Sequence, residues 1–244
     1  MKITPLTPAA PPQASLPQGC LPQGCLPLDC PYPGAQLWWH PLPGAALDGL
    51  TPEELAWGEA LAPAGRKRYW QSRAAMRQVL AVALGCAPQA VPLQSPPGQP
   101  PDLEGGWVSL SHSGEGLLIG HAPLPIGVDL EWGHRRFDAA ALMQRFFPAD
   151  EQRQLSCLAA EPLRSAVLRS WLAKEAAIKW RQRTLAAELA HWSFDHGRGV
   201  LQHRLESITC KPSEGVMGPW RWACVSEAAE LLGTPPITWP FDHG

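Results

Sequence analysis

Two carboxylates on one short stretch carry the most distinctive chemical pattern in the sequence. In PIGVDLEW, Asp129 and Glu131 lie two residues apart in a run whose alternation predicts a half-buried strand. Side chains at i and i+2 of a strand point the same way, so these carboxylates lie side by side. Neighbouring anions repel each other and raise the pKa of at least one of them unless a cation lies between them. The stretch therefore predicts a cation next to this strand.

A third carboxylate and a lysine come from SWLAKEAAIKW. This segment predicts a helix in which Glu175 and Lys179 are four residues apart on one face. In an arbitrary helix such a pair is a surface ion pair that contributes roughly a few tenths of a kcal/mol. Together with Asp129 and Glu131, however, Glu175 completes a set of hard oxygen ligands of the kind that Mg²⁺ or Mn²⁺ binds.

The third pattern is SLSHS, which predicts a strand end with Ser111 on one face and His112 on the other. A lone histidine is more often an ordinary structural residue than a ligand. Serine hydroxyls and an imidazole grouped at a strand end nevertheless suit phosphate oxygens. Further positive charge comes from Arg66, Lys67, Arg68 and Arg73. Carboxylates for a metal, cations for phosphates and a nearby lysine together indicate phosphoryl-transfer chemistry.

Composition and missing motifs exclude several other classes of protein. The sequence has no G-x-x-x-x-G-K-[ST] loop and no G-x-G-x-x-G after a strand, so it does not fit the common nucleotide-binding folds. A net charge of -2 disfavours a dedicated nucleic-acid binder. There is no C-x-x-C pair among the seven cysteines, which disfavours a structural zinc site. Without a long apolar run or a secretory leader, we expect a cytoplasmic protein that does not bind membranes.

The expected helices and strands divide the chain into three regions. Residues 1–35 form a proline-rich, flexible N-terminal arm that repeats LPQGC. Its evenly spaced thiols could bind a soft metal, although slippage of a short coding repeat is the simpler origin. Residues 36–123 and 124–244 then form two similar α+β halves, because helices and antiparallel strands alternate twice along the chain. The second half carries the proposed metal site.

The expected elements follow from capping residues and periodicity. Thr51 and Glu54 predict a capping box at the start of a helix over 52–62. The next helix ends at Gly85, and the longest one spans roughly 161–182. Shorter helices are expected over 136–146 and from Pro148, and strands over 91–93, 107–113, 116–122 and 125–132.

The motifs VSLSHSGEGLLIG, IGVDLEW, FFPADEQRQL and SWLAKEAAIKW resemble, in this order, those of the 4'-phosphopantetheinyl transferases of the larger, single-chain, surfactin-synthetase-activating type. The resemblance covers about residues 36–240. It implies a pseudo-twofold monomer of two α+β halves with coenzyme A in the cleft between them. It also implies transfer of the 4'-phosphopantetheine group to a serine of an acyl or peptidyl carrier protein, in polyketide, nonribosomal-peptide or fatty-acid synthesis, with release of 3',5'-ADP.

The resemblance assigns a role to each candidate residue. Asp129, Glu131 and Glu175 would hold Mg²⁺, with Mn²⁺ as the alternative, on the pyrophosphate of coenzyme A. Glu175 would also act as the general base, and Lys179 would neutralise the pyrophosphate. Ser111 and His112 would contact phosphates of coenzyme A. The remaining coenzyme A contacts fall to Arg66, Arg68 and Arg73.

Two departures from the family pattern affect these assignments. Gln99 stands where the family usually has a lysine that meets a phosphate, and the helix from residue 52 is acidic where many relatives carry basic residues for the 3'-phosphate. Two other functions therefore stay open: a metal-dependent nucleotide phosphohydrolase, and a non-enzymatic relative that only binds carrier proteins. The residues Arg135, Arg136, Met143, Phe146 and Phe147 are either a docking surface for the carrier or, for the apolar ones, part of the core.

Overall fold

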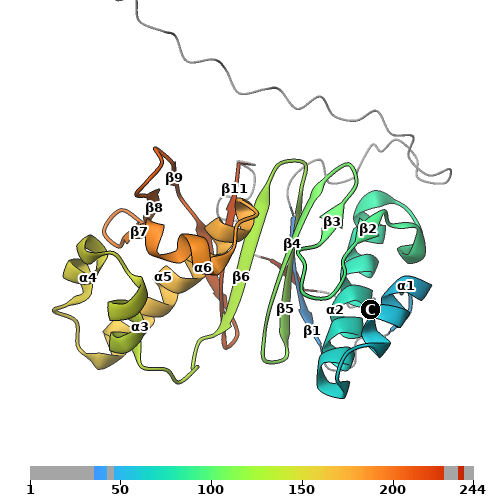
Figure 1. Ribbon diagram of the computed structural model, residues 1–244, viewed down its shortest axis with the longest axis horizontal. Helices are drawn as coiled ribbons and strands as arrows, with labels where there is room; N and C mark the ends of the chain where they lie inside the picture. Colours follow the sequence, from blue (N-terminus) through green and yellow to red (C-terminus); the bar gives the residue numbers. More distant parts are fainter. Residues whose placement is uncertain (1–35, 43–46, 228–235, 239–244) are drawn as a thin grey trace, which may run out of the picture.

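The structure is a computed structural model that describes residues 36–42, 47–227 and 236–238. The N-terminal arm, with its LPQGC repeat, lies outside the described residues. Helices and strands form an α+β protein, as predicted. Figure 1 shows the main strands in the middle of the molecule and the helices at its two ends, α1 and α2 on one side and α3 to α6 on the other. The pseudo-twofold relation between the halves stays a prediction.

The N-terminal half is a four-stranded sheet in the order β12-β1-β5-β4, with α2 packed on it. Strand β1 runs antiparallel to β5 and parallel to β12, so the end of the described chain returns to this sheet. The elements are β1 (Gln36–Pro41), α1 (Pro52–Glu59), α2 (Pro63–Leu84), a 3-10 turn (Pro88–Ala90), β2 (Leu93–Gln94), β3 (Asp102–Leu103), β4 (Trp107–Ser113), β5 (Gly116–Ala122) and β12 (Ile237–Thr238).

The predicted start of α1 and the predicted end of α2 are confirmed, whereas α1 ends at Glu59 rather than at residue 62. Thr51 Oγ1 accepts a hydrogen bond from the backbone N–H of Glu54 at 3.3 Å, and Glu54 Oε2 accepts one from the backbone N–H of Thr51 at 3.0 Å. The Glu54 carboxylate also accepts from Arg77 Nε at 2.6 Å, and both side chains are buried. This capping residue therefore ties α1 to α2. Helix α2 stops at Gly85, whose φ of +62° suits a residue without a side chain.

The C-terminal half contains the long helix and two three-stranded sheets, β10-β11-β6 and β7-β8-β9. Its core lies between α5 and strands β7, β8 and β11. The elements are β6 (Ile126–Trp132), α3 (Ala139–Phe146), α4 (Ala149–Leu155), α5 (Ala160–Trp180), α6 (Leu185–Glu188), a 3-10 turn (Leu189–His191), β7 (Trp192–Asp195), β8 (Val200–His203), β9 (Thr209–Cys210), β10 (Ser213–Met217) and β11 (Trp220–Ser226). No helix in the described ranges is long and apolar enough to cross a membrane.

The structure corrects the expected start of α3, the expected docking surface and the bounds of one strand. The helix begins at Ala139 rather than Arg136, because the Asp138 side chain accepts a hydrogen bond from the backbone N–H of Ala141 and so caps it there. Met143 and Phe147 are buried and pack in a core cluster with α4 and α5, so they do not form a docking surface. The strand expected over 91–93 is shorter and lies at 93–94, after the 3-10 turn.

The two large sheets meet along β4 and β6, and serine side chains join them. The backbone N–H of Val128 donates to Ser109 Oγ at 3.1 Å, and that of Trp132 donates to Ser113 Oγ at 2.9 Å. Both strands advance by four residues between these bonds, so they run in the same direction. The serine face of SLSHS therefore points at β6.

Helix α5 lies unusually close to β6 at Gly127. A Cβ atom at this position would be 2.0 Å from the carbonyl oxygen of Ala176 and 2.2 Å from the backbone nitrogen of Trp180. Only glycine permits this approach of strand and helix. It places the face of α5 that carries Glu175 and Lys179 over Asp129.

Candidate active site

The predicted lysine and carboxylates meet where α5 crosses β6. Asp129 is 2% exposed, and its Oδ1 accepts hydrogen bonds from Ser111 Oγ and from Lys179 Nζ, each at 2.7 Å. Lys179 Nζ also donates to the carbonyl oxygen of Val128 at 3.1 Å and lies 3.8 Å from Glu175 Oε2. In this structure the ammonium group therefore supplies the positive charge between Asp129 and Glu175.

Glu131 and Glu175 complete the acidic cluster. The Glu131 carboxylate accepts from Ser113 Oγ at 3.0 Å and pairs with Arg135 at 2.5 Å. Burial, and then the charge of Asp129, raise the pKa of Glu175 to about 7, although Lys179 acts in the opposite direction. A carboxyl group with this pKa can both accept and release a proton near neutral pH.

The donor chemistry of this cluster fits a divalent cation. Asp129 Oδ2 is buried and has no hydrogen-bond partner among the described residues, which leaves a hard oxygen donor free for a cation. The described part of the chain contains no group of three His, Cys, Asp or Glu side chains already gathered as a metal site. Asp129 and Glu131 are instead ion-paired, with Lys179 and with Arg135 respectively.

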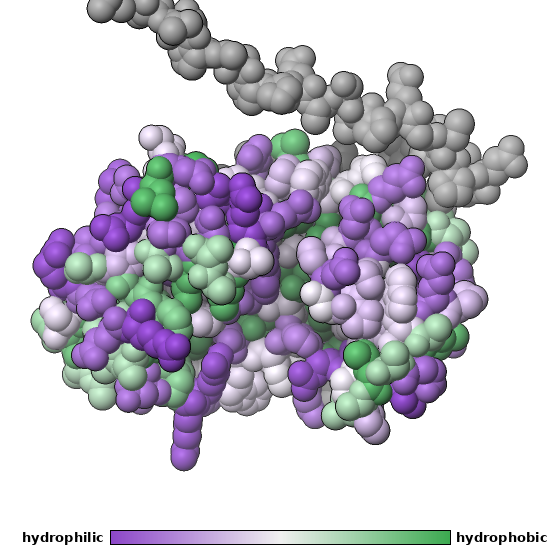
Figure 2. All heavy atoms as spheres, in the orientation of Figure 1, coloured by the Kyte–Doolittle hydropathy of each residue, from purple (hydrophilic) through white to green (hydrophobic). Residues whose placement is uncertain are grey.

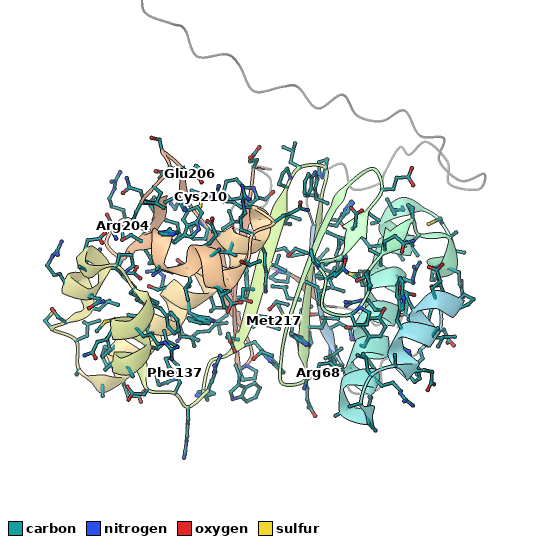
Figure 3. The ribbon with its side chains drawn as sticks, viewed as in Figure 1. Arg68, Phe137, Arg204, Glu206, Cys210 and Met217 are labelled. Carbon is teal, nitrogen blue, oxygen red and sulfur yellow. The ribbon has the colours of Figure 1, made fainter. Side chains whose placement is uncertain are left out.

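A cavity of about 580 Å³ opens beside Lys179. It is walled by α2, β4, the loop 97–101 and the turn that follows α5, so both halves contribute to it. Its lining includes the cations Arg68, Arg73, Lys179 and Arg183, and no aspartate or glutamate. Figure 2 shows the hollow between the two halves, and Figure 3 shows Arg68 between α2 and the central strands. Such a cavity suits a ligand with several negative charges.

His112 lines the same cavity, and its pKa is shifted by the charges around it. Burial lowers the pKa of His112, and the nearby charges of Arg68 and Lys179 lower it further. Arg73 adds a smaller effect of the same sign. Arg73 itself is buried, donates to the carbonyl oxygen of Ser95 at 3.0 Å and therefore also supports the cavity wall.

Two of the predicted phosphate ligands do not line this cavity. Arg66 pairs with Glu59 at 3.0 Å and stacks on Trp70, where it borders a different surface hollow. The hydroxyl of Ser111 is engaged with Asp129. The structure thus brings Arg68, Arg73, His112 and Lys179 together with the carboxylates, and it places Gln99 in the same wall.

Sequence reasoning missed a buried ion pair beneath the site. Lys174 Nζ lies 2.7 Å from Glu151 Oε2, both side chains have no exposed surface, and the ammonium group lies 3.5 Å from the ring centroid of Phe147. Burial lowers the pKa of Lys174 to about 8, while Glu151 favours its charged form. The Glu151 carboxylate also accepts from the backbone N–H of Phe194 at 3.1 Å. The pair fixes α5 against α4 and β7, and the lysine next to Glu175 was its only sequence signal.

We expect Glu151→Ala to destabilise the protein by about 3–5 kcal/mol, because it leaves the Lys174 charge buried without a partner. Urea unfolding monitored by circular dichroism would measure the loss. The double variant Glu151→Ala/Lys174→Met should recover much of it, since the buried charge is then absent. A single variant as stable as the wild type would show that the pair does not hold α5.

The amino-acid sequence is similar to those of known proteins. Residues 125–215 match the 4'-phosphopantetheinyl transferase superfamily. A Synechocystis sp. protein named "Putative 4'-phosphopantetheinyl transferase" is 33% identical over 200 residues, which cover 78% of each chain. The chain belongs to the 4'-phosphopantetheinyl transferase superfamily. The range matched to this superfamily includes Asp129, Glu131, Glu175 and Lys179.

The family has a substrate that carries several negative charges. These transferases use coenzyme A, a ligand with a pyrophosphate and a third phosphate. The cavity wall formed by α2, the loop 97–101 and β4 lies outside the range 125–215. The contacts expected from Arg68, Arg73 and His112 therefore rest on the geometry of this chain.

Proposed function

We propose that the protein transfers the 4'-phosphopantetheine group of coenzyme A to a serine of an acyl or peptidyl carrier protein and releases 3',5'-ADP. The observation that carries this proposal is a cavity lined by four cations and no carboxylate, which Lys179 joins to the cluster of Asp129, Glu131 and Glu175. An anionic substrate is held on one side of Lys179, and the acidic groups lie on the other. We place the protein with the larger, single-chain type and expect a cytoplasmic monomer, because both halves of one chain wall the cavity.

The residues that line the cavity and those of the acidic cluster have different roles in the reaction. Lys179 neutralises the pyrophosphate, and His112, Arg68 and Arg73 face the phosphates from the cavity wall. A Mg²⁺ or Mn²⁺ ion held by Asp129, Glu131 and Glu175 would offset the charge that grows on the leaving phosphate.

Glu175 takes up the proton of the attacking group. As the serine oxygen of the carrier bonds to the β-phosphorus, its proton passes to the Glu175 carboxylate. The bond from the β-phosphorus to the bridging oxygen breaks, and 3',5'-ADP leaves with that oxygen.

Product analysis separates this function from its alternatives. The protein is incubated with coenzyme A, Mg²⁺ and an apo carrier protein, and the nucleotides are separated by chromatography. We expect 3',5'-ADP in proportion to the carrier, and none when the acceptor serine is replaced by alanine. A phosphohydrolase would release nucleotide without any carrier, and a carrier-binding protein without activity would release none.

The environment of His112 predicts a pH dependence. Bound phosphates offset the charges of Arg68 and Lys179 that lower its pKa, so the pKa of His112 should rise on coenzyme A binding. The liganded protein then binds the proton more tightly, and coenzyme A affinity should increase as the pH falls through the interval between the free and bound pKa values. Calorimetric titration at several pH values would measure this, and His112→Gln should weaken the dependence. Glu175, whose pKa of about 7 lies in the same range, accounts for the remainder. An affinity that is independent of pH in the wild type would contradict it.

A further inference from the structure

The turn that follows α5 has a strained residue at its centre. Gln182 has a φ of +52°, and it is the single non-glycine residue with positive φ among the described residues. The backbone N–H of Gln182 donates to the carbonyl oxygen of Lys179 at 2.9 Å, and that of Arg183 donates to the carbonyl oxygen of Ile178 at 3.0 Å. These are the two hydrogen bonds of a Schellman motif, which usually has glycine at the left-handed position. The turn fixes the direction of the chain after Gln182.

The arginines on either side of Gln182 have different environments. Arg181 pairs with Glu188 at 3.1 Å and with Glu206 at 2.8 Å, so its charge is balanced within the protein. Figure 3 shows Glu206 on the C-terminal half, away from Arg68. Arg183 instead lines the cavity. Its charge acts on Glu206 at longer range, but no described residue forms an ion pair or a side-chain hydrogen bond with it. Its guanidinium group therefore remains available to a ligand.

The arrangement of charges indicates which part of the ligand Arg183 meets. Lys179 lies beside Asp129 and Glu175, where the pyrophosphate must react. Arg183 follows the end of α5, four residues further along the chain, and lines the cavity together with Arg68. The remaining anionic group of coenzyme A is its 3'-phosphate. The loop 97–101 offers that phosphate only the neutral Gln99.

We propose that Arg183 binds the 3'-phosphate of coenzyme A and makes the enzyme prefer coenzyme A over its dephospho form. This inference rests on the proposed function. A planar guanidinium group forms paired hydrogen bonds with phosphate oxygens, and the turn at Gln182 brings Arg183 to the edge of the cavity, where it is part of the lining.

The test compares ligands that differ only in the 3'-phosphate. Isothermal titration calorimetry would measure the binding of 3',5'-ADP and of 5'-AMP to the wild type, Arg183→Gln and Arg183→Lys, with Arg198→Gln as the control. Arg198 is an exposed arginine on the turn between β7 and β8, outside the cavity lining. We expect Arg183→Gln to weaken 3',5'-ADP binding about tenfold or more and to leave 5'-AMP binding unchanged. Arg183→Lys should keep part of the affinity, and Arg198→Gln all of it.

Kinetics provide a second measurement of the same preference. In Arg183→Gln the KM for coenzyme A should rise about tenfold while kcat and the KM for dephospho-coenzyme A stay the same. Equal losses for both ligands, or no loss for either, would overturn the assignment. If the wild type transfers phosphopantetheine and Arg183→Gln binds 3',5'-ADP as tightly as the wild type does, only this inference is refuted. A wild type that binds neither nucleotide nor coenzyme A would refute the proposed function itself.

Discussion

Replacing Gly127 by alanine should leave little correctly folded protein. The new methyl group would lie 2.0 Å from the Ala176 carbonyl oxygen and 2.2 Å from the Trp180 nitrogen, both of them backbone atoms of α5. Backbone cannot move aside as the end of a flexible side chain can, so strand and helix must separate. We expect a loss of about 3 kcal/mol or more in the free energy of unfolding, the upper end of overpacking effects. Urea unfolding and the yield of folded protein would measure it.

Gly65→Ala is the matched control for this substitution. Gly65 lies in α2, and an added Cβ would meet only Leu61 Cβ, at 3.9 Å. Alanine should therefore be neutral or stabilise the helix by about 0.5–1 kcal/mol. If Gly127→Ala unfolded at the same urea concentration as the wild type, α5 would not pack on β6 at this distance. The placement of Glu175 near Asp129 would then lose its support.

Asp129→Asn should reduce kcat/KM for the transfer by about 100-fold or more while the protein remains folded. The substitution preserves the shape of the side chain but removes the charge that Lys179 pairs with and that a cation would bind. Single-turnover rates measured over a range of Mg²⁺ concentrations would show whether cation binding is weakened as well. Circular dichroism would confirm the fold.

Asp138→Asn provides the control for the loss of a carboxylate. Asp138 caps α3 at a distance in sequence from the site, and asparagine is an equally good capping residue. Transfer by this variant should equal that of the wild type. If Asp129→Asn reduced kcat/KM less than threefold, the acidic cluster would have no major part in the reaction.

Local sequence patterns predicted the elements that carry the site. The alternation around Asp129, the capping box at Thr51 and the four-residue spacing of Glu175 and Lys179 depend on neighbours along the chain, and the structure confirms the strand and the helices. The 3.8 Å separation of Glu175 and Lys179 agrees with that spacing. Short-range stereochemistry was sufficient for these features.

The features that sequence alone could not predict depend on contacts between distant segments. Ser111 meets Asp129 because β4 lies beside β6, which no pattern within SLSHS could indicate. Arg68 lines the cavity and Arg66 does not. Side chains two positions apart on a helix point about 200° apart, so only one of the two can face the cavity. Likewise Arg183 reaches the cavity through a turn with glycine-like backbone at Gln182, where no glycine signals it.

Intact-protein mass spectrometry of the carrier would detect the transfer of phosphopantetheine to its serine directly. An apo acyl or peptidyl carrier protein would be incubated with this protein, coenzyme A and Mg²⁺, beside a reaction that contains Asp129→Ala. We expect the carrier to gain the mass of one phosphopantetheine group with the wild type and no mass with the variant. An unchanged mass for several acyl and peptidyl carriers, with a wild type that still binds coenzyme A, would contradict it.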